Sequence, residues 1–121
     1  MSRIARKNIR LKRAYELPAA DDGVRILVDR LWPRGVKKAD AGIHRWLKDI
    51  APSTELRRWF GHDAARWGEF SRRYRKELGH HPAEIDELHS LARRSPITLV
   101  FAARDELHNE AIVLRDFLLQ P

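Results

Sequence analysis

The stretch that decides the fold is Arg25-Ile26-Leu27-Val28-Asp29-Arg30-Leu31-Trp32-Pro33-Arg34-Gly35. Its apolar residues are partly β-branched and do not alternate with polar ones, which is typical of a strand buried on both faces. We predict that this strand covers residues 25–32 and stops at Pro33, because proline cannot donate a hydrogen bond to a sheet. Charged and aromatic side chains gather where the strand ends, so the loop that follows is the first candidate site.

Two further segments have the character of strands. Residues 97–102 form a nearly continuous apolar run, as expected of a central strand, and lead through a polar loop into a final helix. Residues 9–15 alternate apolar with charged side chains and predict a half-buried strand. Strand, polar loop and helix in this order indicate an α/β fold with an open, mostly parallel sheet.

Helices are expected between these strands. Ser53 and Asp63 are good N-caps, and Gly61 and Gly79 are suited to end the helices that follow them. The predicted helices cover residues 43–49, 53–60, 63–78 and 82–94, and a last helix carries Leu107, Ala111, Leu114 and Leu118 on one face.

Composition limits the class of protein. The chain has 121 residues, which suits one domain, and it contains no cysteine, so disulfides and thiol chemistry are excluded. Its longest apolar run, residues 97–103, is too short to cross a bilayer. We therefore expect a cytoplasmic protein without a membrane partner. The spacing of the six histidines matches no metal-binding motif, so neither a metal nor a cofactor is expected.

The positive charge is concentrated at the N-terminus. Of the net charge of +7, +6 falls within residues 1–13, which leaves +1 for the rest of the chain. We predict a basic, disordered arm over residues 1–8 and a single α/β domain over residues 9–121. Together with the Arg-rich helix at 63–78, the arm suggests a nucleic-acid-binding accessory protein as an alternative function.

An ordered set of motifs runs through nearly the whole chain, from about residue 10 to residue 119. The set consists of Leu27-Val28-Asp29-Arg30-Leu31-Trp32-Pro33-Arg34-Gly35 with Lys37 or Lys38, Trp46, Ala51-Pro52-Ser53 with Glu55-Leu56-Arg57, Phe70 with Tyr74 and Glu77-Leu78, Thr98-Leu99, and Asn109 with Ala111. In these motifs the chain resembles the YeaO-like branch of domain of unknown function family four hundred eighty-eight.

The resemblance implies a small, single-domain, three-layer α/β protein, whereas the activity of the family is uncharacterised. Longer members of the broader family carry cysteines around the loop after the last strand. Here that loop has Ala102, Ala103, His108 and Asn109 instead, so a thiol-based role is not transferred.

Ligands in open α/β sheets usually bind beyond the carboxyl ends of the strands. If the strands at 25–32 and 97–102 are parallel neighbours, residues 29–35 lie beside residues 103–109. This adjacency is the central structural prediction. It would bring Arg30, Trp32 and Arg34 to the wall of one cleft, together with Asn109.

Each candidate residue has a functional and a structural interpretation. Arg34 offers a bidentate fork for phosphate or carboxylate, or it stacks on Trp32 or Trp46 and only holds the loop. Asp29 is the candidate catalytic residue, as an orienting group or base, although an aspartate at a strand end is commonly a cap.

Ser53 and Arg57 lie one turn apart at a helix start, where an anion would bind well, or Ser53 simply caps the helix. The leading hypothesis is binding of an anionic small molecule, phosphate-like or nucleotide-like, in a cleft formed by residues 29–35, 53–57 and 103–109. Whether the protein is also an enzyme stays open at this point, as does a purely structural role of the Trp and Arg residues.

Overall fold

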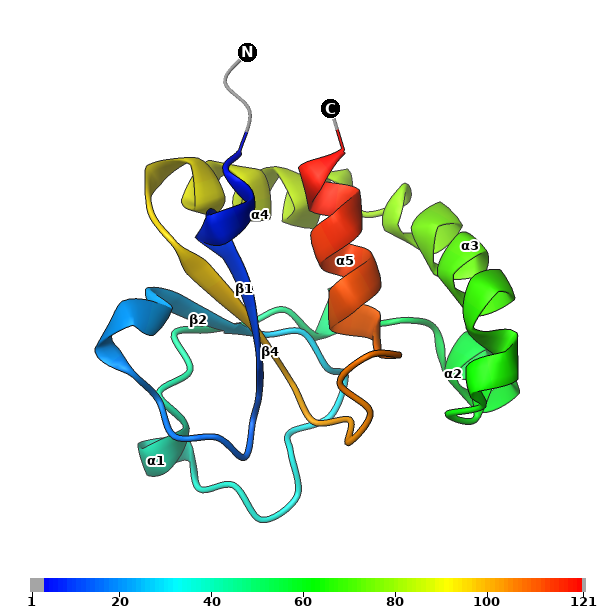
Figure 1. Cartoon of the computed structure of the whole chain (residues 1–121), viewed down its shortest axis with the longest axis horizontal. Coiled ribbons are helices and arrows are strands. Elements are labelled where there is room, and N and C mark those ends of the chain that lie inside the picture. The colour runs from blue at the N-terminus through cyan, green and yellow to red at the C-terminus, as the bar shows by residue number, and fades with distance from the viewer. Residues whose placement is uncertain (1–3, 121) are drawn as a thin grey trace.

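The computed structural model describes residues 4–120 and contains one sheet of four parallel strands (Figure 1). The strands are β1 (Ile9–Arg13), β2 (Val24–Leu27), β3 (Arg45–Trp46) and β4 (Ile97–Phe101), in the spatial order β1-β4-β2-β3. All three strand pairs are parallel, which confirms the predicted α/β class and the parallel sheet.

Strand β4 lies between β1 and β2, and all five of its residues are buried. A strand covered on both faces needs apolar side chains throughout, so the continuous apolar run explains this central place. Leu99 pairs with Leu11 on one side and with Ile26 on the other. The carboxyl ends of β2 and β4 therefore lie next to each other.

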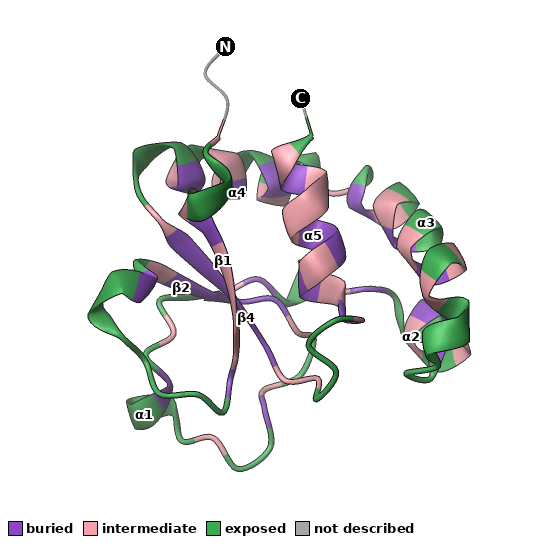
Figure 2. Ribbon diagram, in the orientation of Figure 1, coloured by how far each residue is buried: buried purple, intermediate pink, exposed green. Residues whose placement is uncertain are grey.

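The larger core lies between one face of the sheet and a group of helices. Figure 2 shows their buried faces turned inward. These helices are α2 (Thr54–Phe60), α3 (Trp67–Leu78), α4 (Pro82–Arg94) and α5 (Glu110–Leu119). Buried residues of all four belong to the same cluster as Ile26 and Leu99 of the sheet.

The opposite face of the sheet has a smaller core. Leu27 and Val100 are fully buried there with Ala14, and Trp32 and Trp46 pack against them. Loops and the short helix α1 (Lys38–Ala41) lie on this side of the sheet. The molecule thus has helices over one face of the sheet and mainly loops over the other.

Local capping signals agree with the observed helix starts. Ser53 accepts a hydrogen bond from the N–H of Leu56 at the start of α2, and Asn109 accepts one from Ile112 at the start of α5. Asp63 caps a short 3-10 turn, Ala64–Arg66, rather than α3 itself, which begins at Trp67. Gly61 ends α2 in the left-handed conformation that glycine adopts readily.

The helix predicted at 43–49 is wrong. The segment instead forms β3 and a 3-10 turn, Lys48–Ile50. His44 and Leu47 donate their N–H groups to the carbonyls of Arg25 and Leu27, so the exposed edge of β2 holds this segment as a strand. Such an edge offers unpaired backbone groups that a short helix cannot use.

Two predicted boundaries also change. The strand predicted at 25–32 ends at Leu27 as a regular strand, and only the N–H of Val28 still donates across to β4, at the carbonyl of Val100. Leu107, expected on the apolar face of the last helix, lies before α5 and is 74% exposed. The polar loop after β4 is therefore longer than expected.

The basic arm lies partly outside the described residues, because Met1–Arg3 are not among them. The described part contains a 3-10 turn, Arg6–Asn8, in which the side-chain amide of Asn8 donates to the carbonyl of Ala92 at 2.8 Å. Disorder of the arm as a whole stays a prediction.

Candidate functional site

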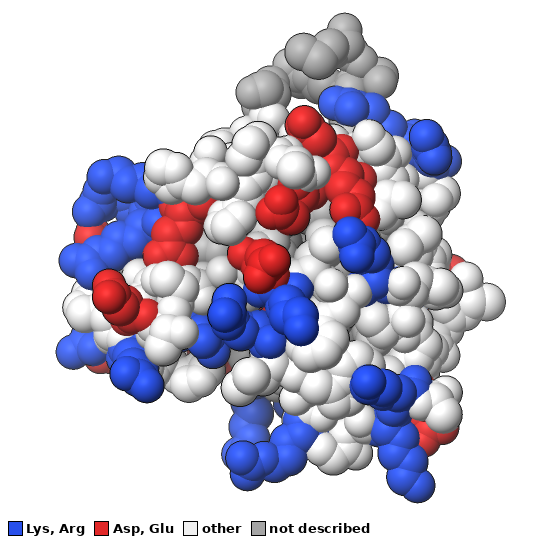
Figure 3. Space-filling view, turned by 180° about the vertical axis from the view of Figure 1, so that it is seen from behind, with Lys and Arg blue, Asp and Glu red and all other residues white. Residues whose placement is uncertain are grey.

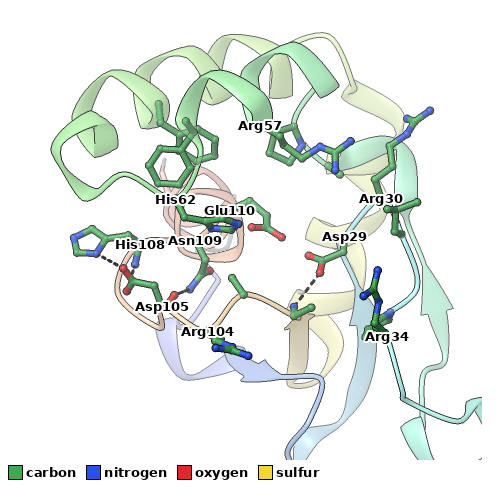
Figure 4. Close-up of a pocket in the computed structure, with 18 of the residues that line it drawn as sticks. Asp29, Arg30, Arg34, Arg57, His62, Arg104, Asp105, His108, Asn109 and Glu110 are labelled. Atoms are coloured by element: carbon green, nitrogen blue, oxygen red, sulfur yellow. Dashed lines mark hydrogen bonds and ion pairs between the residues drawn. The ribbon is translucent and has the colours of Figure 1, made fainter.

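A cavity of about 760 Å³ opens at the carboxyl ends of β2 and β4. The lining comes mainly from the loop after β2, from the connection from β4 into α5, and from α2 with the residues that flank it (Figure 4). Tyr15 and Phe70 complete the lining. Its volume lies within the range of small-molecule sites. The predicted adjacency of residues 29–35 and 103–109 is present in the structure, because Arg34 and Asn109 line the same cavity.

Most of the candidate residues are brought together there. Asp29, Arg30, Trp32, Arg34, Arg57 and Asn109 all line the cavity. Ser53 does not line it. Its hydroxyl donates to a carboxylate oxygen of Glu77 at 2.6 Å, and its own N–H donates to the other oxygen at 2.8 Å. Ser53 therefore caps α2 and joins it to α3, which is the structural alternative for this residue.

Asp29 has one structurally engaged oxygen and one free oxygen. Its Oδ2 accepts a hydrogen bond from the N–H of Ala102 at 2.9 Å and so ties the loop after β2 to the end of β4. Its Oδ1 is buried and has no hydrogen-bond partner among the described residues. The backbone carbonyl of Asp29 accepts from the Trp46 indole at 2.7 Å, which holds the residue in place.

Glu110 was not predicted from the sequence and faces Asp29 across the cavity (Figure 4). Burial raises the pKa of the Glu110 carboxyl well above its usual range, and hydrogen bonding and electrostatic repulsion with the Asp29 carboxyl raise the pKa further. Glu110 therefore keeps its proton under conditions that ionise an ordinary glutamate. An acidic residue in the first turn of a helix is commonplace, so the sequence contained no signal for this pairing.

The raised pKa of Glu110 makes stability depend on pH. Glu110 ionises near 4.5 when unfolded and higher when folded. Between these values the folded protein binds more protons than the unfolded chain, so the contribution of Glu110 to stability is fully present below pH 4.5 and is lost as the pH rises through the folded pKa.

Glutamine at this position keeps the size of the side chain and does not ionise. Relative to the wild type, Glu110→Gln should therefore gain stability by up to about 1.4 kcal/mol per pH unit across this window. Urea unfolding of both proteins at a series of pH values measures the difference. A difference that does not change with pH would contradict the raised pKa.

Arg57 projects from α2 into the cavity region between Asp29 and Arg30 (Figure 4). Its Nε is buried and has no partner within residues 4–120, and one Nη donates only to the hydroxyl of Thr54 at 3.2 Å. Its guanidinium makes no ion pair of 4 Å or less among the described residues.

The two arginines of the loop after β2 are exposed. Arg30 and Arg34 lie on the rim, and the carbonyl of Arg34 accepts from the Tyr15 hydroxyl. The alternative in which Arg34 stacks on a tryptophan is not observed, because lysines occupy these positions: Lys38 lies over Trp32 and Lys48 over Trp46. The Trp32 indole donates to the carbonyl of Val36, so Trp32 mainly shapes the loop.

The connection after β4 is organised by Asp105. Its carboxylate accepts from the N–H groups of Leu107 and His108, and the His108 ring lies 2.9 Å away. These contacts lower the pKa of Asp105, with the Leu107 N–H as the largest cause. The buried Asn109 donates one side-chain N–H to the carbonyl of Asp105 and caps α5, which positions Glu110 in the first turn of that helix.

The Arg-rich helix has much of its charge neutralised locally. Arg72 and Arg73 both hydrogen-bond to Glu69, and the Arg73 guanidinium lies over the ring of Trp59. The left side of Figure 3, where α3 lies in this view, shows acidic and basic groups interspersed. Hydrogen bonds to both arginines lower the pKa of Glu69 to about 2.

Residues 4–120 contain neither a cluster of metal ligands nor a membrane span. These residues include no group of three or more His, Asp or Glu side chains that could hold a metal ion. None of their helices is both long and apolar enough to cross a membrane.

The fold and the cavity define a small, all-parallel α/β protein with a loop-lined pocket at the carboxyl end of its sheet. A family model described as "Inactive DUF488-N3 subclade" matches residues 8–121, so the chain belongs to this subclade of the DUF488 family. The resemblance found in the sequence motifs is thereby confirmed.

Curated relatives extend over nearly the whole chain. The chain is 44% identical over 111 residues to the uncharacterised protein YeaO of Escherichia coli, with 92% of this chain and 96% of the relative covered. It is 46% identical over 110 residues to uncharacterised proteins of Mycobacterium bovis and Mycobacterium tuberculosis, covering 91% of this chain and 92% of each relative. No solved structure matches the chain.

Proposed function

We propose that this protein binds an anionic small molecule, phosphate-like or nucleotide-like, in the cavity at the carboxyl ends of β2 and β4. Arg57 and Arg34 act as the anion clamps. The description of the matching family model as an inactive subclade supports binding without turnover.

The buried Nε of Arg57 carries this proposal. It lacks a partner among the described residues although its residue lines a cavity with three carboxyl groups, those of Asp29, Asp105 and Glu110. A buried donor without an acceptor costs about 1–3 kcal/mol, and a charged one costs more. An anion in the cavity would remove this cost, because the planar guanidinium matches the oxygens of phosphate and carboxylate groups.

The distribution of charge around the cavity supports the same ligand class. Arg30, Arg34 and Arg104 surround the opening together with Arg57 (Figure 4). Of the three carboxyl groups that line the cavity, Glu110 retains its proton because its pKa is raised by burial. An approaching anion therefore meets four guanidinium groups and a partly neutralised floor.

Replacing Arg57 by glutamine tests the proposal. We expect binding of inorganic phosphate or adenosine 5′-monophosphate to weaken by about 10- to 100-fold, because a hydrogen bond to a charged group contributes about 1.5–3 kcal/mol. Titration calorimetry measures the affinity, and the ligand-dependent rise of the melting temperature provides an independent readout.

Arg58→Gln is the matched control. It makes the same change of charge on the neighbouring residue of α2, which is exposed and does not line the cavity. Its phosphate affinity should stay within about twofold of the wild type, since an exposed charge is screened by salt. Equal losses in both variants would show general charge attraction, and no binding of either probe by the wild type would refute the proposal.

A further inference from the structure

The cavity contains an unsatisfied acceptor as well as an unsatisfied donor. Apart from the neighbouring Glu110 carboxyl, Asp29 Oδ1 is buried without a partner, as is Arg57 Nε, and both residues line the same cavity. The two groups do not pair with each other, since no ion pair between Asp29 and Arg57 occurs within residues 4–120. A simple anion satisfies only Arg57 and supplies no donor for Asp29 Oδ1.

The carboxyl pair has more acceptor capacity than the protein fills. A carboxylate offers about four lone-pair positions on its two oxygens. Asp29 uses Oδ2 for the N–H of Ala102. The proton retained by Glu110 supplies one O–H donor, which leaves acceptor positions of both carboxyl groups open toward the cavity. Hydrogen-bond donors of a ligand would fill them.

The cavity is large enough for a ligand that carries an anionic group and a hydrogen-bond donor group some distance apart. The volume of the cavity is about 760 Å³, whereas one water molecule takes up about 30 Å³ in the liquid. The cavity therefore has room for much more than a phosphate ion. Phe60 of α2 and Phe70 of α3 contribute an apolar part of the cavity wall. An organic body can therefore lie in the cavity and connect an anionic group with a donor group.

We infer that the ligand is an organic anion that also carries an amino or other N–H donor, with its anionic group at Arg57 and its donor group at the Asp29–Glu110 carboxyl pair. This inference rests on the proposed anion site and names the class of molecule that it takes. Aminoalkyl phosphates and aminopurine nucleotides belong to this class, whereas inorganic phosphate and simple alkyl phosphates do not.

Two pairs of probes test the inference because the members of each pair differ by one amino group, which is a cationic ammonium in the first pair and a neutral N–H donor in the second. One pair is O-phosphoethanolamine and ethyl phosphate; the other is adenosine 5′-monophosphate and purine riboside 5′-monophosphate. In at least one pair we expect the amino compound to bind about tenfold more tightly, since a hydrogen bond to a charged group contributes roughly that much. Titration calorimetry on the full-length protein gives both affinities.

Asp29→Asn tests whether the preference for the amino compounds arises from the Asp29–Glu110 carboxyl pair. Asparagine retains a side-chain oxygen for the N–H of Ala102 and presents a donor where the wild type has an acceptor. The tenfold preference should fall to about twofold or less, while ethyl phosphate binds at least as well as before. Asp86→Asn makes the same change of charge on the exposed surface of α4, away from the cavity, and should keep the preference.

The outcomes separate this inference from the proposed function. If both members of each pair bind equally and Arg57→Gln weakens both, the anion site stands and the donor subsite is refuted. A preference that survives in Asp29→Asn also refutes the subsite. If none of the four probes binds the wild type, both proposals fail.

Discussion

Replacing Asp22 by alanine is expected to lower the free energy of unfolding by about 3–5 kcal/mol. Asp22 is 5% exposed, and its Oδ2 accepts from Arg25 at 2.6 Å and from the N–H of Ala19 at 3.0 Å. Lys12 completes the group at 3.2 Å. The Arg25 side chain is itself only 3% exposed, so removing Asp22 leaves a buried guanidinium without its counter-charge.

The neighbouring residue provides the control for this prediction. Asp21 also forms an ion pair, with Arg10 at 3.1 Å, but its side chain is 76% exposed. Asp21→Ala should therefore change stability by less than about 1 kcal/mol. Guanidinium chloride unfolding of both variants measures the difference, and similar losses in the two would contradict the importance of burial.

The pH dependence of Asp22 has the opposite sign to that of Glu110. Burial alone would raise the pKa of Asp22, but hydrogen bonds from Ala19, Lys12 and Arg25 outweigh it and lower the pKa. The contribution of Asp22 is thus fully present above its unfolded value of 3.8 and is lost as the pH falls through the lower, folded value. Asp22→Asn should weaken the loss of stability below about pH 4.

Gly23→Ala is expected to destabilise the protein by at least about 3 kcal/mol. Gly23 has a φ of +66°, and a Cβ at this position would overlap the carbonyl oxygen of Pro96. That oxygen accepts the N–H of Val24 at the start of the β2–β4 pairing. The clash therefore cannot be relieved without disturbing the two strands that position the cavity.

Gly35→Ala distinguishes the clash from backbone strain. Gly35 has a φ of +81°, but a Cβ there would have nothing within 4 Å. Gly35→Ala should therefore lower the free energy of unfolding only by the conformational penalty of about 1–2 kcal/mol. Thermal unfolding of both variants by circular dichroism provides the comparison. A cost for Gly35→Ala as large as that for Gly23→Ala would show that the contact with Pro96 is not decisive.

The location of the candidate site could be predicted, whereas its chemistry could not. The apolar runs around Leu27 and Leu99 indicate parallel buried strands, and loops at the carboxyl ends of neighbouring parallel strands necessarily meet. The Asp29–Glu110 pair is different, because it joins residues 81 positions apart that each look ordinary in their own segment. The sequence places Ser53 in the site because this residue begins a helix, but a helix start alone does not show which way the helix faces.

The amino-acid sequence by itself determined the features that depend on nearby residues. The apolar run of β4, the caps at Ser53 and Asn109 and the α/β class follow from side-chain periodicity and from hydrogen bonds within a few positions.

Only the tertiary structure decided which distant groups share one environment. It paired β3 with the edge of β2, buried the Asp22–Arg25 ion pair, and placed Arg57 and Asp29 in one cavity without a direct pair between them. Burial and electrostatic interaction depend on distances in space, and these distances are established only when the chain is folded.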